Sequence, residues 1–213
     1  MSAFRVAVLA SGTGTNLQAI LDHIHGRSVA EGGTFVEVVG VGSDKPEATA
    51  LRRAAEAGIA CAVFAAADYP DRATRDSALG DWLEELEVDL VVLAGYMQLL
   101  GADFLARFPR RVINVHPALL PAFPGIGAVE QAVAHGAQVF GVTVHCVDEG
   151  IDTGPIIVQR ALELPGATDA ATVRAALRPL EHDLLCHVVQ AIARGDVELA
   201  GSRGIVRPDD AAG

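Results

Sequence analysis

The sequence predicts an α/β fold: a Rossmann-like, mostly parallel sheet flanked by helices, with an antiparallel C-terminal strand pair. Short apolar runs alternate along the chain with segments whose apolar residues recur at helical spacing. The early runs are apolar at successive positions, which is typical of strands covered on both faces. Two later runs, 138–147 and 156–163, are joined by a segment too short for a crossover helix, so we expect them to pair antiparallel.

The order of the expected elements follows from this alternation. The expected parallel strands are 5–10, 36–41, 62–64, 90–94 and 112–115, and the expected helices are 16–25, 47–57, 72–86 and 101–108. A last helix should run over about 169–193 and be bent or interrupted at Pro179, because proline lacks the N–H that a helix interior needs. With no repeat and no separating linker visible, we predict one domain over residues 1–200 and a flexible tail over 201–213.

Composition and charge narrow the class of protein. Of 213 residues, 51% are hydrophobic and 20% are charged, which is typical of a folded chain. A net charge of −11 disfavours nonspecific binding to nucleic acid or to an anionic membrane. Three cysteines form no disulfide framework, and neither a signal peptide nor an apolar run of membrane-spanning length is visible. We therefore expect a cytoplasmic protein, monomeric or homodimeric, with small-molecule rather than nucleic-acid or membrane partners.

A glycine-rich loop, Ser11-Gly12-Thr13-Gly14-Thr15-Asn16, follows the first strand and opens the first helix. Glycines let the backbone approach a ligand, and the start of a helix offers unpaired N–H groups to an anion. The loop lacks the Gly-Lys-Ser/Thr of a Walker A motif, and Leu17 stands where a dinucleotide fingerprint would place glycine. It therefore suits one phosphate better than a pyrophosphate, although a plain tight turn explains the glycines equally well.

A polar pair, Asn114 and His116, lies at the end of a predicted parallel strand. Ligands of open α/β sheets bind at the carboxyl ends of strands, and residues two apart in a strand point to the same side. An amide and an imidazole together can stabilise negative charge that develops on a carbonyl oxygen. A buried histidine bonded to backbone is the alternative, and the polar pair favours chemistry over it.

The loop between the two late strands, 148–155, holds three carboxylates and two glycines. Asp148 and Glu149 fit solvated positions, whereas glycines and Pro155 would fix the backbone of Asp152. If Asp152 approaches His116, its charge favours the imidazolium form. His145 has the alternation of a strand and is expected to be an ordinary core or surface histidine, with support of the site as the alternative.

The remaining candidate groups carry no recognisable motif. His23, His25, His135 and His187 are assigned no role. No His, Cys and Asp residues have convincing metal-ligand spacing, and no Ser-His-Asp order stands out, so we predict neither a metal nor a covalent nucleophile.

Taken together, the motifs resemble those of the phosphoribosylglycinamide (GAR) formyltransferase family of purine biosynthesis. The resemblance rests on residues 11–18, on Leu93-Ala94-Gly95-Tyr96-Met97, on residues 114–121, on Val144-His145 and on residues 152–156, and it covers about 5–195. It implies transfer of the formyl group of 10-formyltetrahydrofolate, a cosubstrate, to GAR without a metal. It also implies that the N-terminal half binds the phosphate and the C-terminal half the folate.

The resemblance further implies roles for individual residues. Asn114, His116 and Asp152 would form the catalytic trio. GAR would be bound by Gly14, Thr15, Asn16, Arg178, Pro179, Leu180 and Glu181. The folate would be bound by Arg72, Met97, Gln98, Leu99, Leu100, Asn114, Asp148, Glu149, Gly150, Ile151 and Asp152.

Two departures from the family pattern and three rival functions remain at this point. Gly127 stands where the family usually has histidine, and Pro179 precedes Glu181 in the last helix. Formyltetrahydrofolate hydrolase and the catalytic domain of methionyl-tRNA formyltransferase share the Asn-x-His-Pro motif. The chain starts at the first strand and stops just past the last helix, from which we expect neither of these two enzymes, and its net charge of −11 further disfavours a tRNA substrate. A non-catalytic nucleotide-binding module would explain the glycine loop but would leave the trio as coincidence.

Overall fold

The computed structural model describes residues 3–29 and 34–198 and the backbone of 205–206. The chain divides into two compact units, Met1–Asn114 and Val115–Gly213, which are described in turn. The predicted tail over 201–213 lies outside the described residues except for the backbone of Ile205–Val206.

The first unit is built on parallel strands, as the continuous apolar runs predict. The strands are β1 Ala3–Leu9, β2 Phe35–Ser43, β3 Ala60–Val63, β4 Leu90–Leu93 and β5 Val112–His116, whose last residues enter the second unit. β1 is central, because it pairs with β2 on one side and with β4 on the other. The strand order is therefore β3-β2-β1-β4-β5, and every pair is parallel.

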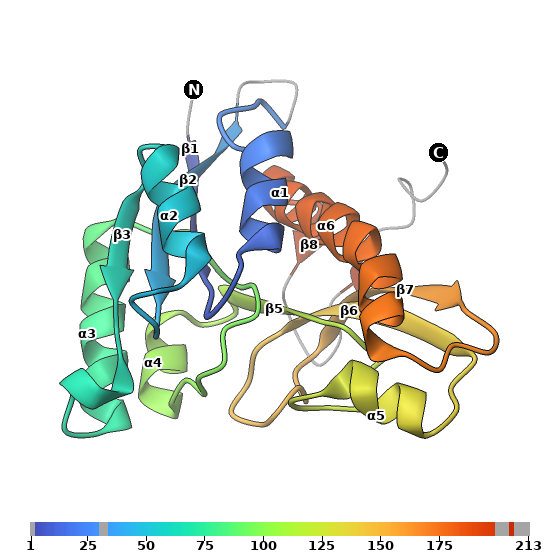
Figure 1. The fold of residues 1–213 in the computed structure, drawn as a ribbon. Coiled ribbons are helices and arrows are strands. Elements are labelled where there is room, and N and C mark those ends of the chain that lie inside the picture. Colours follow the sequence, from blue (N-terminus) through green and yellow to red (C-terminus); the bar gives the residue numbers. More distant parts are fainter. Residues whose placement is uncertain (1–2, 30–33, 199–204, 207–213) are drawn as a thin grey trace. The chain divides into compact units, whose positions relative to one another are not determined.

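Helices connect these strands and cover the sheet. They are α1 Thr15–His23, α2 Thr49–Glu56, the 3₁₀ turn η1 Ala66–Asp68, α3 Arg72–Glu85 and α4 Ala102–Arg107. Parallel strands are joined by right-handed crossovers. The chain passes from β1 through β2 to β3 and then crosses back to β4 on the other side of β1, so α1 and α2 cover one face of the sheet and α3 covers the other (Figure 1). Trp82 and Leu86 pack where Gly40 of β2 leaves room for them.

The core of this unit is the middle of the sheet. The side chains of residues 6–9 in β1 and 91–92 in β4 are wholly buried, which explains why both runs are apolar at every position. The reversal of strand order at β1 creates a topological switch point, where ligands of such sheets bind.

The second unit contains the expected antiparallel pair, β6 Val139–Cys146 with β7 Ile156–Glu163. The long helix α6, Ala170–Arg194, packs on both strands and begins where the Asp169 carboxylate accepts the N–H of Thr172 at 2.7 Å. It continues through Pro179, so of the two outcomes expected there, a bend or an interruption, the interruption is wrong. Helix α5, Ala128–Ala134, was not predicted, and β8 Val197–Glu198 pairs with β9 Ile205–Val206.

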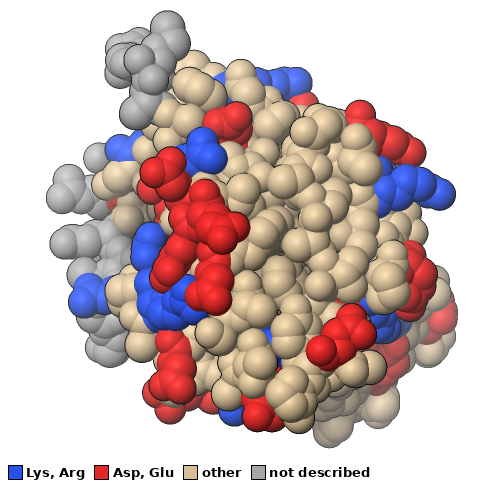
Figure 2. Space-filling view, turned by 90° about the vertical axis from the view of Figure 1, so that its left-hand side faces the viewer, with Lys and Arg blue, Asp and Glu red and all other residues tan. Residues whose placement is uncertain are grey.

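Charged side chains are unevenly spread on the face drawn in Figure 2. Asp and Glu side chains gather there in a band with Lys and Arg beside it, next to a broad uncharged area. Within the first unit, Arg107 binds Asp81 and Glu84 at 2.7 Å each, so part of the acidic excess is paired locally. No helix in the described part of the chain is both long enough and apolar enough to cross a membrane.

Candidate active site

The glycine loop lies at the switch point of the first unit. Gly14 precedes α1 with φ 69°, and a Cβ there would come within 2.8 Å of Ala50, so both backbone and packing require glycine. A pocket of about 210 Å³ opens at the loop and is lined by residues 12–16 with Ala94 and Gly95. The start of a helix and glycine backbone together favour an anion in this pocket.

Arg53 is a residue at this loop that the motifs did not reveal. From α2, its Nε donates to the carbonyl of Thr13 at 2.9 Å and its Nη1 to Gln18 Oε1 at 2.8 Å. The guanidinium therefore fixes the loop and brings a positive charge to it. Its position in α2 follows no sequence pattern that points to the loop.

The segment after β4 is irregular and presents apolar side chains. Met97 and Leu99 are each 54% exposed, whereas Tyr96 and Leu100 are buried. Met97 N–H donates to Ser11 Oγ at 2.8 Å, which ties this segment to the glycine loop. Arg72 lies beside Gly101, at the far end of this segment, since a Cβ added to Gly101 would be 3.9 Å from the Arg72 guanidinium. The predicted folate residues of the first unit thus lie along one stretch of chain and beside it.

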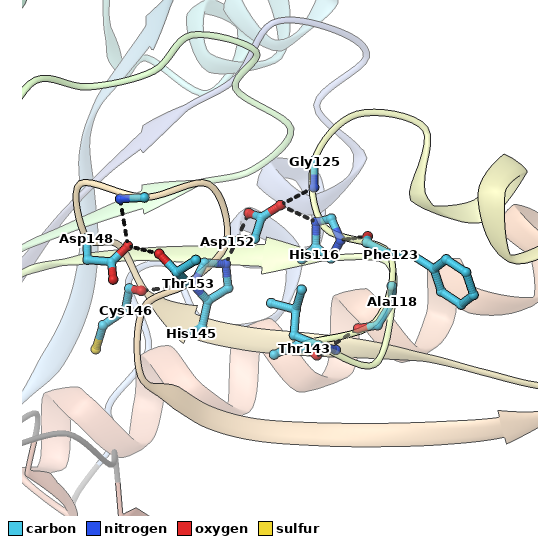
Figure 3. Close-up of polar contacts among 12 residues, drawn as sticks. His116, Ala118, Phe123, Gly125, Thr143, His145, Cys146, Asp148, Asp152 and Thr153 are labelled. Atoms are coloured by element: carbon cyan, nitrogen blue, oxygen red, sulfur yellow. Dashed lines mark hydrogen bonds and ion pairs between the residues drawn. The ribbon is translucent and has the colours of Figure 1, made fainter.

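His116 ends β5 and is buried, with 5% of its surface exposed. Its Nδ1 lies 3.3 Å from Asp152 Oδ2, and its Nε2 lies 2.8 Å from the carbonyl oxygen of Phe123 (Figure 3). The structure therefore contains the contact between His116 and Asp152 that the sequence analysis left open. Asn114 lies two residues earlier in the same strand, so strand geometry places it on the same side as His116.

Asp152 is held by groups around both of its carboxylate oxygens. Gly125 N–H donates to Oδ2 at 2.7 Å, and His145 Nε2 lies 3.5 Å from Oδ1 (Figure 3). Burial alone would raise the pKa of Asp152. The hydrogen bonds from His145 and Gly125 and the charge of His116 outweigh that effect and lower the pKa to about 2. The carboxylate is therefore ionised at neutral pH.

His145 is buried in β6 and also contacts Asp152. It is 2% exposed, and its Nδ1 lies 2.8 Å from the carbonyl oxygen of Cys146 while its Nε2 faces Asp152. This burial is that of the expected core histidine, and the contact with Asp152 is the one that the alternative requires, because the turn at 148–155 brings Asp152 back over β6. Strand alternation showed which face His145 shares with Thr143, but not what lies on that face.

The loop that carries Asp152 is held by its own side chains. Asp148 Oδ1 accepts the N–H of Gly150 at 3.1 Å and the hydroxyl of Thr153 at 2.7 Å. Asp152 itself has φ 53°, in the left-handed region that few non-glycine residues adopt. Ile151 is 53% exposed. Asp148 is thus exposed, as expected of a loop acid, but it shapes the loop as well.

The segment that follows β5 is held in place by Thr143 of β6. Thr143 donates its hydroxyl to the Ala118 carbonyl at 2.7 Å and accepts the N–H of Leu120 at 3.1 Å (Figure 3). Gly127, the departure from the family pattern, has φ 77° and precedes α5, so glycine suits this backbone. Of the other predicted residues, 178–181 lie within α6, and nothing in the described contacts tests their role.

No group of three or more His, Cys, Asp or Glu side chains among the described residues is arranged to hold a metal ion. Asp152 and the two histidines beside it, His116 and His145, form a set suited to proton transfer and charge stabilisation.

Comparison with known proteins agrees with the motifs. The model of the formyl transferase family matches residues 4–189. The chain is 43% identical over 197 residues to phosphoribosylglycinamide formyltransferase of Mycobacterium tuberculosis, covering 92% of this chain and 88% of that one. It is 38% identical to the Bacillus subtilis enzyme of the same name, over 88% and 94% of the two chains.

Solved structures give the same result. A glycinamide ribonucleotide transformylase from Symbiobacterium toebii superposes with a TM-score of 0.88 at 41% identity, covering 96% of this chain and 94% of that one. Sequence match and fold thus agree over nearly the whole length, and the chain belongs to the formyl transferase family.

Proposed function

We propose that the protein transfers the formyl group of 10-formyltetrahydrofolate to the primary amine of phosphoribosylglycinamide, a step of purine biosynthesis. The products are formyl-GAR and tetrahydrofolate. The observation that carries this proposal is the buried contact of 3.3 Å between His116 and Asp152, next to Asn114 in the same strand. Relatives that bear the name of this enzyme and match most of the chain support it.

The phosphate of GAR is proposed to bind at Gly14, Thr15 and Asn16. The support is a pocket of about 210 Å³ at the start of α1 and the guanidinium of Arg53 beside the loop. Arg178, Pro179, Leu180 and Glu181 stay a prediction as further GAR contacts.

The folate is proposed to contact Arg72 and the segment from Met97 through Gln98 and Leu99 to Leu100. The support is the exposure of Met97 and Leu99, two apolar side chains that an aromatic ligand would cover. We also propose contacts with Asn114 and with the loop residues Asp148, Glu149, Gly150, Ile151 and Asp152.

In the proposed reaction the amine nitrogen of GAR attacks the formyl carbon, and the carbonyl oxygen gains negative charge. The amide of Asn114 donates a hydrogen bond to that oxygen, and the imidazolium of His116 provides a charge-assisted one. The ionised Asp152 lies 3.3 Å from Nδ1 of His116 and so keeps the ring oriented for this hydrogen bond.

Both ring nitrogens of His116 already have a partner, so one of them must leave its partner to donate a hydrogen bond to the substrate. Nε2 faces the neutral Phe123 carbonyl, whereas Nδ1 faces the Asp152 carboxylate. A carboxylate holds a donor more strongly than a neutral carbonyl does. We therefore propose that Nε2 is the nitrogen that turns to the formyl oxygen, while Nδ1 stays on Asp152.

The reaction balances once a proton has moved from the attacking amine to N10 of the folate. The bond between the formyl carbon and the GAR nitrogen forms, and the bond between that carbon and N10 breaks. We propose that water held by Asp152 carries the proton. Holding both substrates in place supplies a further part of the rate.

The test is a spectroscopic assay of the purified protein with 10-formyltetrahydrofolate, with and without GAR. Release of tetrahydrofolate that depends on GAR, with formyl-GAR detected by mass spectrometry, is the expected result. Release at the same rate without any amine acceptor would instead indicate a hydrolase. Binding of GAR without transfer would indicate a non-catalytic module.

A further inference from the structure

Helix α3 contains a buried ion pair that the proposed mechanism does not use. Arg75 and Asp76 are 3% and 4% exposed, and Nη2 of the arginine lies 2.7 Å from Oδ1 of the aspartate. Charged side chains are rarely buried this far, and replacing such a pair by apolar residues is often neutral or stabilising. Net stability is therefore a weak explanation for this pair.

Both side chains of the pair also form hydrogen bonds to the segment after β4. Arg75 Nη1 donates to Gln98 Oε1 at 2.6 Å, and Nη2 donates to the carbonyl of Leu99 at 2.9 Å. Asp76 Oδ2 accepts the N–H of Gly101 at 2.8 Å. Residues 96–101, all of which the structure describes, belong to no helix or strand, so side chains supply hydrogen bonds that a ladder would otherwise make.

This arrangement fixes how the segment presents its side chains. Gln98 is held from two sides, because its Nε2 also donates to Asp44 Oδ2 at 3.0 Å. On either side of it, Met97 and Leu99 are each 54% exposed. Exposed apolar side chains on irregular backbone would lose a defined orientation without such anchors.

We propose that Arg75 and Asp76 are positioning residues, which hold the segment 97–101 in the conformation that binds the formyl folate. This inference rests on the proposed function. It predicts that the ion pair matters for the folate and not for GAR. Arginine is required at this position because one planar guanidinium serves Asp76, Gln98 and Leu99 at once, which the single ammonium of lysine cannot do in the same geometry.

The test compares the double variant Arg75→Met/Asp76→Leu and the single variant Arg75→Lys with the wild type. The control is Arg107→Met, which removes an arginine that binds two acidic residues of the same helix at its exposed side. In the double variant we expect the KM for the formyl folate to rise about tenfold or more, with the KM for GAR within about twofold. Arg75→Lys should not restore the wild-type KM, and Arg107→Met should leave it unchanged.

The variant Gln98→Met removes one of these hydrogen bonds without changing α3, so it keeps the test valid if the α3 variants misfold. It should raise the KM for the folate by a smaller factor. An unchanged folate KM in all three variants, or an equal rise of both KM values, would overturn the proposal.

Amide hydrogen exchange separates this proposal from the proposed function. In Arg75→Met/Asp76→Leu the N–H of Gly101 should exchange faster, while the amides of β1 keep their protection. If the wild type transfers no formyl group, the proposed function fails, and exchange at Gly101 still decides whether the ion pair orders the segment. Unchanged exchange there would overturn the positioning role.

Discussion

Asp152 lies with its carboxylate 3.3 Å from Nδ1 of His116, although all of β6 separates the two residues in the sequence. Two features of the structure bring these residues together. Asp152 adopts a left-handed backbone conformation in a loop closed by Asp148 and Thr153, and Gly125 N–H holds its Oδ2 at 2.7 Å. The charge of this carboxylate is the feature from which the first prediction follows.

The pKa of Asp152, about 2, makes the stability of the protein depend on pH in the acidic range. Because the folded value lies below the ordinary one of about 3.9, the stabilisation is fully present above that value and is lost as pH falls toward 2. Its size is about 2 kcal/mol. Urea unfolding of wild type and Asp152→Asn between pH 6 and 2 measures it, and the variant should show a flatter decline. Parallel curves for the two proteins would refute the linkage.

His145 is predicted to keep Asp152 ionised. Its hydrogen bond is the largest of the influences that lower the pKa of Asp152, so His145→Ala should raise that pKa toward the ordinary value. Carbon-13 NMR titration of the carboxylate measures the shift. Turnover should fall, but by less than in His116→Ala, while His23→Ala serves as the control. An unmoved Asp152 titration would show that His145 only fills space.

Arg53 is predicted to contribute to GAR binding through the glycine loop. Arg53→Met removes the donor to the Thr13 carbonyl and a positive charge beside the pocket, so the KM for GAR should rise with little change in the KM for the folate. The neighbouring Arg52 forms an exposed ion pair with Glu56 at 3.8 Å and gives the matched control. Equal effects of Arg52→Met and Arg53→Met would count against a role at the loop.

Gly14→Ala tests the shape of the same loop. The new Cβ would meet Ala50 and would force a left-handed backbone on alanine, so we expect a loss of stability on the order of 2 kcal/mol. Thermal and urea unfolding measure it, and Gly12→Ala, which has open space around its Cβ, is the comparison. A variant as stable as wild type would mean that the loop adapts.

Much of the fold could be predicted because the strands of the first unit are buried on both faces. Apolar runs such as 90–94 and 5–10 leave few alternatives, and β1 and β4 lie where they were expected. Helix α5 was not predicted, because its seven residues, Ala128–Ala134, are too few to show a helical period. An interruption, one of the two outcomes expected at Pro179, did not occur, since a long helix packed on two strands tolerates the loss of one hydrogen bond.

The candidate site was predictable where motif residues sit at strand ends, as Asn114 and His116 do. It was not predictable where the partner is set by tertiary contact. No motif in the sequence singles out Arg75, yet it is buried, because the fold brings Gln98 and Leu99 to it. The cytoplasmic location, the oligomeric state and the lack of nucleic-acid partners stay predictions.

Single-turnover transfer from 10-formyltetrahydrofolate to GAR, measured in wild type, His116→Ala and Asn114→Ala, tests the account most directly. An oxyanion donor is typically worth about 3–4 kcal/mol, so each variant should still bind both substrates but transfer the formyl group roughly a hundred- to a thousandfold more slowly. Transfer at the wild-type rate in either variant would contradict the assignment of that residue to the reacting oxygen.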